Sequence, residues 1–209
     1  MLELVMFDAD GVLFDSTEAN TAYYNAIFAL MDEPRMNPEE EKAGVFMSAP
    51  QVFELRARGD RVKFDRMRES ARTMDATPFF NLMRPPVELR PFLSAMKRRY
   101  RLALATNRSA TIPALIGHLG LDGIFDAVAS ARDPVRPKPA PDIVELCLAR
   151  AGVAASRAVY VGDSETDRVA AAAAGTHFIG VGARVDHDYR IDRLIDLPDH
   201  LERRFGHAD

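Results

Sequence analysis

The chain is poor in features that mark several large classes of protein. It contains one cysteine, Cys147, so no disulfide can form within the chain, which agrees with a reducing compartment. No apolar run reaches the roughly 20 residues of a membrane-spanning helix, and Asp8 and Asp10 interrupt the first run too early for an export signal. A net charge of −4 gives no reason to expect a nucleic-acid partner. We therefore expect a cytoplasmic protein that binds neither membranes nor nucleic acids.

The remaining pattern is that of a globular protein in which strands alternate with helices. Hydrophobic residues make up 47% of the chain and charged residues 28%, close to the average for soluble proteins. Short apolar strands are predicted at LELVMF, RLALAT, FDAVAS, AVYVG and HFIGVG, with helical patterns between them and a further strand and helix at the end. Alternation of this kind favours a parallel sheet covered on both faces, so we expect an α/β fold.

One long segment breaks this alternation. No convincing strand occurs between Ser16 and Arg84, where helical patterns run over about residues 16–32, 38–46 and 50–74. We therefore predict two parts. The core comprises residues 1–15 and 84–209, and a small all-helical domain, residues 16–83, is inserted after the first strand. Asp15 marks the point where the chain leaves the core.

The helical segment carries a basic stretch interleaved with acidic residues. Its basic members are Arg56, Arg58, Arg61, Lys63, Arg66, Arg68 and Arg72. Such a run is most often the solvated face of a helix pair. The alternative is that one member reaches into a cleft and binds an anionic substrate.

Polar side chains follow the predicted strands of the core. In chain order they are Asp8 and Asp10, Thr106 and Asn107, Lys138, and Asp163 and Asp167. Each group alone is explained by turn formation or helix capping. Together they meet at the carboxyl edge of a parallel sheet, where ligands bind, and so many carboxylates in one crevice require a cation. Oxygen-rich sites select hard divalent ions, and we predict Mg²⁺.

Four short motifs carry a resemblance to a known family. In chain order they are DADGVLFDS, TN, the lysine of RPKPAPD, and GDSETD, and they resemble the motifs of the haloacid dehalogenase-like superfamily of phosphohydrolases. The resemblance is to its phosphoglycolate phosphatase-like branch, and it covers essentially the whole core. It implies a Rossmann-like parallel sheet with a small helical cap domain inserted after the first strand.

The resemblance implies a catalytic role for several of these residues. Asp8 matches the family's nucleophile, which forms an aspartyl-phosphate intermediate. Asp10 matches its general acid and base, which the family's dehalogenases lack, so phosphoryl rather than halide chemistry is implied. Thr106 and Asn107 are expected to donate hydrogen bonds to the phosphoryl group. Lys138 is expected to neutralise that group and to keep Asp8 ionised.

The resemblance also implies a Mg²⁺ site. Its expected ligands are the side chains of Asp8 and Asp163 and the backbone carbonyl of Asp10. Asp167 could be a direct or water-mediated ligand, and we favour a position behind the ligands, where it supports Lys138 or a metal-bound water. Ser164 is expected to cap the helix that follows Asp163.

Other residues with reactive side chains are predicted to be structural. Cys147 lies in the helical pattern DIVELCLAR and is expected to be a small core residue. His118 and His177 are expected to have structural roles. Arg108 is expected to be an exposed loop arginine, with a substrate contact as the alternative.

The favoured function is a Mg²⁺-dependent phosphatase acting on a small phosphorylated metabolite, with phosphoglycolate a candidate by analogy alone. Two alternatives remain: a phosphomutase of the β-phosphoglucomutase type, which shares every core motif, and a non-catalytic binding protein on the same fold. A phosphonatase would need a lysine in the cap, and neither Lys42 nor Lys63 has a recognisable context.

Overall fold

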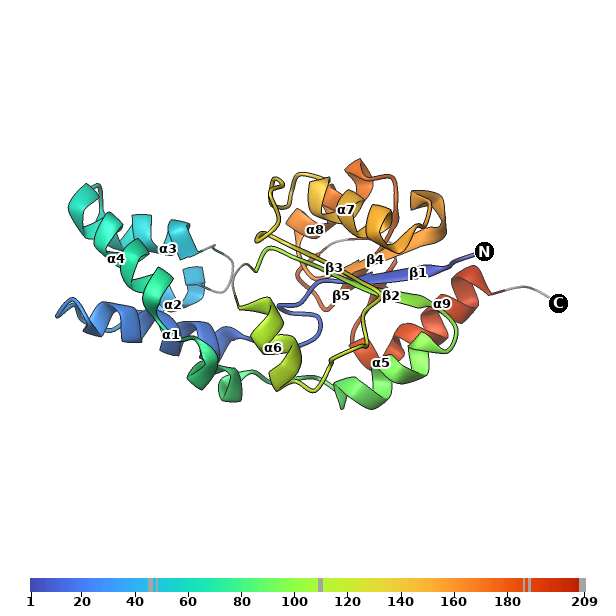
Figure 1. Cartoon of the computed structure of the whole chain (residues 1–209), viewed down its shortest axis with the longest axis horizontal. Coiled ribbons are helices and arrows are strands. Elements are labelled where there is room, and N and C mark those ends of the chain that lie inside the picture. The colour runs from blue at the N-terminus through green and yellow to red at the C-terminus, as the bar shows by residue number, and fades with distance from the viewer. Residues whose placement is uncertain (45–46, 48, 109–110, 186, 188, 207–209) are drawn as a thin grey trace. The chain divides into compact units, whose positions relative to one another are not determined.

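The computed structural model of the chain describes residues 1–44, 47, 49–108, 111–185, 187 and 189–206. The chain divides into two compact units (Figure 1). The larger unit consists of Met1–Asp15 and Pro85–Asp209, and the smaller one of Ser16–Arg84. No helix among the described residues is long and apolar enough to cross a membrane.

The larger unit is built on one six-stranded sheet, in the order β3-β2-β1-β4-β5-β6, and all neighbouring strands run parallel. The strands are β1 (Leu4–Phe7), β2 (Arg101–Thr106), β3 (Ala127–Ser130), β4 (Ala158–Gly162), β5 (His177–Val181) and β6 (Arg190–Ile191). β1 is buried along its whole length, as the uninterrupted apolar run LVMF of a strand covered on both faces requires. The predicted parallel α/β sheet is confirmed.

Helices cover both faces of this sheet, with α7 and α8 on one face and α5 and α9 on the other (Figure 1). The helices are α5 (Leu89–Lys97), α6 (Ile112–His118), α7 (Asp142–Ala151), α8 (Glu165–Ala173) and α9 (Leu197–Phe205), with the 3₁₀ turns η2 (Ala155–Arg157) and η3 (Leu194–Asp196). α7 shows why these segments pack as they do. It buries Ile143, Cys147 and Ala151, which are four residues apart and so lie on one side of the helix.

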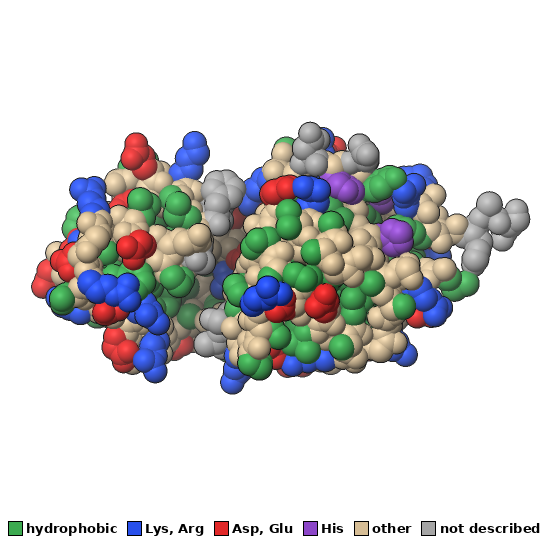
Figure 2. Space-filling view, turned by 90° about the horizontal axis from the view of Figure 1, so that it is seen from above, with side chains coloured by type: hydrophobic (Ala, Val, Ile, Leu, Met, Phe, Trp, Pro, Cys, Tyr) green, Lys and Arg blue, Asp and Glu red, His purple; other side chains and the backbone are tan. Residues whose placement is uncertain are grey.

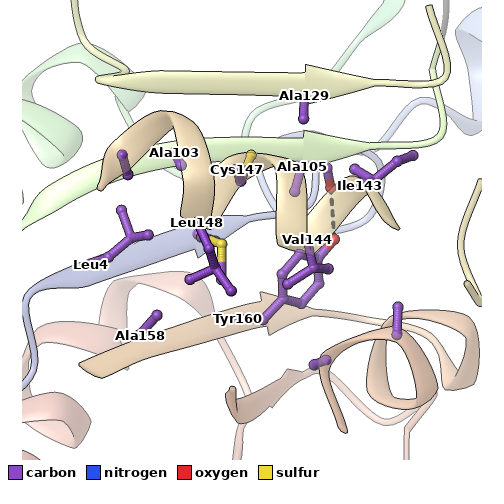
Figure 3. Close-up of a cluster of buried hydrophobic side chains, with 14 of the residues drawn as sticks. Leu4, Ala103, Ala105, Ala129, Ile143, Val144, Cys147, Leu148, Ala158 and Tyr160 are labelled. Carbon is purple, nitrogen blue, oxygen red and sulfur yellow. Dashed lines mark hydrogen bonds between the residues drawn. The ribbon is translucent and has the colours of Figure 1, made fainter. Parts of the chain in front are cut away.

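The core between α7 and the sheet contains the cysteine of the chain (Figure 3). Cys147 is fully buried, and its Sγ lies 3.2 Å from the carbonyl oxygen of Leu104. Burial raises the pKa of its thiol to about 12, so the thiol is a poor nucleophile near neutral pH. The prediction of a small core residue is confirmed. Tyr160 of β4 lies in the same cluster, and its hydroxyl donates to the carbonyl of Ala105 (2.7 Å).

The smaller unit is helical along its described residues. Its helices are α1 (Thr17–Ala29), α2 (Pro38–Gly44), α3 (Ala49–Ala57), α4 (Arg61–Thr73) and the 3₁₀ helix η1 (Thr77–Leu82). Its buried core includes Tyr24, Ile27, Phe28, Phe53 and Met67. The predicted end of one helix at residue 46 lies outside the described residues.

The helical stretch predicted over residues 50–74 is interrupted in the structure. α3 ends at Ala57, and Arg58 and Gly59 take left-handed backbone angles (φ of 50° and 86°) that end a helix. Asp60 then begins α4, because its side chain accepts a hydrogen bond from the backbone N–H of Lys63 (3.0 Å). The segment therefore forms two helices joined by a tight turn.

The basic stretch of the smaller unit is largely a solvated face, as predicted, although Lys63 is only partly exposed and one member is buried. Figure 2 shows acidic and basic side chains interspersed on this unit, and the exposed members are Arg58, Arg61, Arg66, Arg68 and Arg72. The buried member is Arg56, whose side chain is 8% exposed and pairs with Glu40 (Nη2 to Oε2, 2.7 Å). Its guanidinium also lies 4.2 Å from the ring centroid of Phe28. Arg56 therefore stabilises the interior of the unit.

Candidate active site

The first candidate residues lie in the loop that follows β1. The backbone N–H of Asp8 donates to the carbonyl of Val161 (2.9 Å), so Asp8 continues the pairing of β1 with β4. The chain then turns at Gly11, which has a φ of 79° and donates its N–H to the carbonyl of Phe14 (2.8 Å). Asp8 is buried, whereas Asp10 is partly exposed. The central strand thus holds the first carboxylate rigidly and the second within reach of solvent.

Lys138 connects several of the predicted site residues. Its ammonium nitrogen lies 2.8 Å from Oδ1 of Asp8 and 2.6 Å from Oδ1 of Asp167. It also donates to the hydroxyl of Tyr160 (2.7 Å) and lies 3.3 Å from the carbonyl oxygen of Ala105. The Lys138 side chain is only 3% exposed, so water contributes little to its solvation. Lys138 therefore contacts both Asp8 and Asp167, as expected for residues of one site.

Burial and mutual charge determine the protonation of this cluster. Burial raises the pKa of Asp8 well above its usual range, the neighbouring carboxylates raise it further, and Lys138 opposes both. Burial lowers the pKa of Lys138, but Asp167 and Asp8 more than offset this and leave it above its usual value. Lys138 therefore stays charged at neutral pH, and its contact favours the carboxylate form of Asp8.

The residues at the end of β2 support the loop that carries Lys138. The side chain of Asn107 pairs with the backbone of Lys138 in both directions: Nδ2 donates to the carbonyl (3.0 Å), and Oδ1 accepts from the N–H (2.8 Å). Thr106 is buried, and its Oγ1 accepts a hydrogen bond from the N–H of Arg108 (3.1 Å). The hydrogen bonds that we expect Thr106 and Asn107 to donate to a phosphoryl group stay predictions.

Asp163 and Asp167 lie at the junction of β4 and α8. Ser164 caps α8, because its Oγ accepts from the N–H of Asp167 (3.3 Å) while Oδ2 of Asp167 accepts from the N–H of Ser164 (3.1 Å). The prediction that Ser164 caps this helix is confirmed. The other oxygen of Asp167 contacts Lys138. Both oxygens of Asp167 are thus hydrogen-bonded, which favours a supporting role over direct chemistry.

Asp163 has a partner that we did not predict. Nη1 of Arg184 lies 2.9 Å from Oδ2 of Asp163. Burial and the charge of Asp167 raise the pKa of Asp163 to about 6, and Arg184 and Lys138 oppose this rise. Arg184 follows β5 closely, so the pattern of polar residues at strand ends extends to it. Tyr160 was also missed, because it lies within an apolar strand and only its hydroxyl reaches the site.

Arg108 is not the exposed loop residue that we predicted. Its side chain is 17% exposed, and its Nε and Nη2 each lie 2.7 Å from a carboxylate oxygen of Asp10. The prediction was wrong because β1 and β2 are neighbours in the sheet, so the loops that follow them meet. A guanidinium in one loop then matches a carboxylate in the other, since its two N–H groups fit the two oxygens.

Three of the carboxylates form a group that fits a metal ion. One oxygen each of Asp8, Asp163 and Asp167 lies within 4.8 Å of the others, and all three residues are buried. A donor set made of oxygen alone suits a hard divalent cation such as Mg²⁺. Our predicted set used the backbone carbonyl of Asp10 in place of the Asp167 side chain, and that ligand stays a prediction.

Known proteins resemble the chain along most of its length. A family model described as haloacid dehalogenase-like hydrolase matches residues 5–181. The chain belongs to this family. It is 27% identical over 204 residues to the pyrophosphatase PpaX of Bacillus velezensis, covering 92% of this chain and 93% of the relative. It is 28% identical over 196 residues to a phosphoglycolate phosphatase of Pseudomonas syringae pv. tomato, covering 88% of this chain and 71% of the relative.

The fold of this haloacid dehalogenase-like hydrolase is also similar to that of a solved structure. It is the crystal structure of a subfamily IA member from Geobacter sulfurreducens PCA, with a TM-score of 0.81, 30% identity and 96% of each chain covered. The predicted family and fold and the prediction of a hydrolase are confirmed.

Gly11 provides a test of how tightly the site of this hydrolase is packed. A Cβ at Gly11 would lie 2.0 Å from Oδ2 of Asp163, so Gly11→Ala must displace that carboxylate. We expect Gly11→Ala to lower the free energy of unfolding by about 2–4 kcal/mol, from left-handed backbone strain and overpacking together. Urea unfolding measures this change. Stabilisation by Mg²⁺ should also weaken, because the displaced Asp163 is a predicted ligand.

Gly59→Ala is the matched control for this experiment. Gly59 has a similar φ of 86°, but nothing lies within 4 Å of a Cβ placed there. This variant should lose only the strain contribution of about 1–2 kcal/mol, with Mg²⁺ stabilisation unchanged. Equal effects of the two substitutions would show that Asp163 is not held against Gly11.

Proposed function

We propose that the protein is a Mg²⁺-dependent phosphatase that hydrolyses a small phosphorylated metabolite through an aspartyl-phosphate intermediate. The observation that carries the proposal is the buried contact of 2.8 Å between the Asp8 carboxylate and the Lys138 ammonium at the carboxyl edge of the sheet. A carboxylate nucleophile beside a fixed cation suits the transfer of an anionic phosphoryl group. Relatives named as a pyrophosphatase and a phosphoglycolate phosphatase support the same class of reaction.

In the first step, a carboxylate oxygen of Asp8 attacks the phosphorus of the ester. The bond between phosphorus and the leaving oxygen breaks, and protonated Asp10 gives its proton to that oxygen as the alcohol departs. Lys138 balances the charge of the phosphoryl oxygens, and Thr106 and Asn107 donate hydrogen bonds to them. The product of this step is phosphorylated Asp8.

In the second step, water attacks the phosphorus of the intermediate. Asp10 takes a proton from the water, the bond between phosphorus and the Asp8 oxygen breaks, and inorganic phosphate leaves. Both side chains are then restored, with the proton on Asp10 ready for the next ester. The same residue thus acts as acid and as base, and it must be able to exchange protons with substrate and water.

Mg²⁺ would be held by Asp8, Asp163 and the backbone carbonyl of Asp10. When bound, the ion would supply positive charge that reduces the repulsion of the nucleophile and the phosphoryl group. Arg184 fixes one oxygen of Asp163, and Asp167 fixes Lys138. These two contacts keep the charged groups of the site in place before substrate arrives.

We propose residues 16–83 as the cap domain of a catalytic core formed by residues 1–15 and 84–209. The compact helical unit Ser16–Arg84 supports this division, and a cap can exclude water and add specificity contacts. Lys63, one of the two lysines weighed for amine chemistry, is 2.6 Å from Oε1 of Glu33. This ion pair opposes a role for Lys63 as a Schiff-base nucleophile.

A phosphate-release screen tests the proposal. The panel contains phosphoglycolate, pyrophosphate, fructose 1-phosphate and the two glucose 1-phosphate anomers, each with MgCl₂ and with a chelator. We expect release from at least one compound with Mg²⁺, its loss with chelator, and its recovery when Mg²⁺ is added back. Absence of release from every compound would contradict a phosphatase. Conversion of one sugar phosphate isomer to another without net phosphate release would instead show a mutase.

A further inference from the structure

Arg108 and Asp10 form a charged pair that the proposed mechanism does not use. Nε of Arg108 lies 2.7 Å from Oδ2 of Asp10, and Nη2 lies 2.7 Å from Oδ1, so both carboxylate oxygens face the guanidinium. The backbone N–H of Arg108 is bonded to Thr106, and its guanidinium lies 5.7 Å from the ring centroid of Phe14. The residue is therefore fixed at both its backbone and its side chain.

This pair conflicts with the proton transfers assigned to Asp10. Both carboxylate oxygens of Asp10 are bonded to the guanidinium, so they point at Arg108 rather than at substrate or water. The side chains of Arg108 and Asp10 are 17% and 34% exposed, so the pair is only partly screened by water. The pair must nevertheless open in each catalytic cycle.

A second anionic group on the substrate is the competitor that fits this position. The transferring phosphoryl group is already served by Lys138, whereas Arg108 follows directly on the phosphate-binding pair Thr106 and Asn107 in the chain. We propose that Arg108 is a specificity-determining residue that binds a second oxyanion of the substrate and thereby releases Asp10 for proton transfer. The inference rests on the proposed function and narrows its substrate to phosphomonoesters that carry a further carboxylate or phosphate.

The binding part of the inference can be tested without turnover. Calorimetry with Mg²⁺ would compare phosphonoacetate and ethylene-1,2-diphosphonate, which carry a second anion, with ethylphosphonate, which does not. A hydrogen bond to a charged group is worth about 1.5–3 kcal/mol. The native protein should therefore bind at least one of the two probes with a second anion about 10- to 100-fold more tightly than ethylphosphonate. Arg108→Gln should abolish this difference in affinity. Which of the two probes the native protein prefers shows whether the second anion of the substrate is a carboxylate or a phosphate. No preference in the native protein would overturn the inference.

The release of Asp10 is tested by turnover of two esters of similar size. Phosphoglycolate carries a carboxylate, and 2-hydroxyethyl phosphate carries a neutral hydroxyl in its place. Arg108→Gln should lower kcat/KM for phosphoglycolate about 10- to 100-fold but raise kcat for the neutral ester several-fold, since Asp10 is no longer held. Equal losses on both esters would show that Arg108 only supports the loops. If neither ester releases phosphate while the binding preference holds, the proposed function fails and the anion site stands.

Two further variants serve as controls. Arg136→Gln removes an arginine whose side chain is 75% exposed and pairs with Asp142, and it should leave the preference between the probes unchanged. Arg108→Lys keeps the charge but cannot face both oxygens of a carboxylate, so it should retain part of the preference. Urea unfolding of each variant shows whether the fold is preserved. If Arg108→Gln does not fold, the partial loss of the preference in Arg108→Lys tests the inference instead.

Discussion

Asp8→Asn is expected to lower the rate of phosphate release by about 1,000-fold or more while the protein stays folded. The amide oxygen of asparagine cannot form the acyl phosphate, but it can still accept the hydrogen bond of 2.8 Å from Lys138. The substitution also removes a buried carboxylate whose pKa is raised by burial and by its acidic neighbours. Stability near neutral pH should therefore be equal to or greater than that of the native protein.

Asp15→Asn is the matched control for this experiment. Asp15 lies in the same loop, but it is exposed and we assign it no chemistry. Phosphate release should be close to native in Asp15→Asn and absent in Asp8→Asn, and urea unfolding should give similar free energies for both variants. Native turnover by a folded Asp8→Asn protein would remove Asp8 as the nucleophile.

The positions of the predicted site residues could be inferred from one property of parallel sheets. Asp8 and Lys138 are 130 residues apart in the sequence, yet both lie at the carboxyl edge of the sheet and touch. Parallel strands deliver their following loops to one edge, so polar residues after several apolar strands meet there. This argument needs only the strand pattern, which was clear because each core strand is short, apolar and followed by a polar turn.

The pairing of side chains within the site could not be inferred in this way. Arg108 was predicted to be exposed because a loop position alone does not show that a neighbouring loop presents a carboxylate to it. Tyr160 was read as an apolar strand residue, and only the geometry shows its hydroxyl reaching Lys138 (2.7 Å). Long side chains can turn in several directions, so their partners depend on rotamers and not on sequence spacing.

The break in the predicted helical stretch has a different cause. Helical periodicity continues on both sides of Arg58 and Gly59, and a glycine within a helix costs only about 1 kcal/mol relative to alanine. The left-handed angles of these two residues nevertheless end α3. The cap formed by Asp60 and the burial of Phe64 and Met67 favour a new helix over a continuous one.

Lys138→Met is expected to impair both stability and activity, because it leaves Asp8 and Asp167 facing each other without their shared cation. Breaking a buried ion pair on one side costs about 3–5 kcal/mol, so the free energy of unfolding at pH 9 in chelator should fall by about that amount. Phosphate release should fall at least about 100-fold, because the charge that stabilises the phosphoryl group is lost. Urea unfolding and the release assay measure the two effects.

The dependence of this loss on pH identifies its origin. Lys138 lowers the pKa of Asp8 against the effect of burial, so removing it raises that pKa further above the value of about 3.9 for an unfolded aspartate. Burial already raises the pKa of Asp8 to about 8 in the native protein, so native and variant both hold this proton at lower pH. The variant keeps the proton where the native protein loses it, so its stability relative to the native protein falls as pH rises through about 8. A loss of equal size at pH 6 and pH 9 would mean that packing, not charge, is responsible.

Lys97→Met is the control that shows how much of the loss in Lys138→Met comes from burial of the ion pair. Lys97 also bonds a carboxylate, Asp126 (3.0 Å), but its side chain is 34% exposed, compared with 3% for Lys138. Because water solvates the partner left behind, the loss should be about 1 kcal/mol or less, with native turnover. A difference of several kcal/mol between the two methionine variants, present at pH 9 and reduced at pH 6, would show that the desolvated carboxylates around Lys138 make this lysine indispensable to both folding and catalysis.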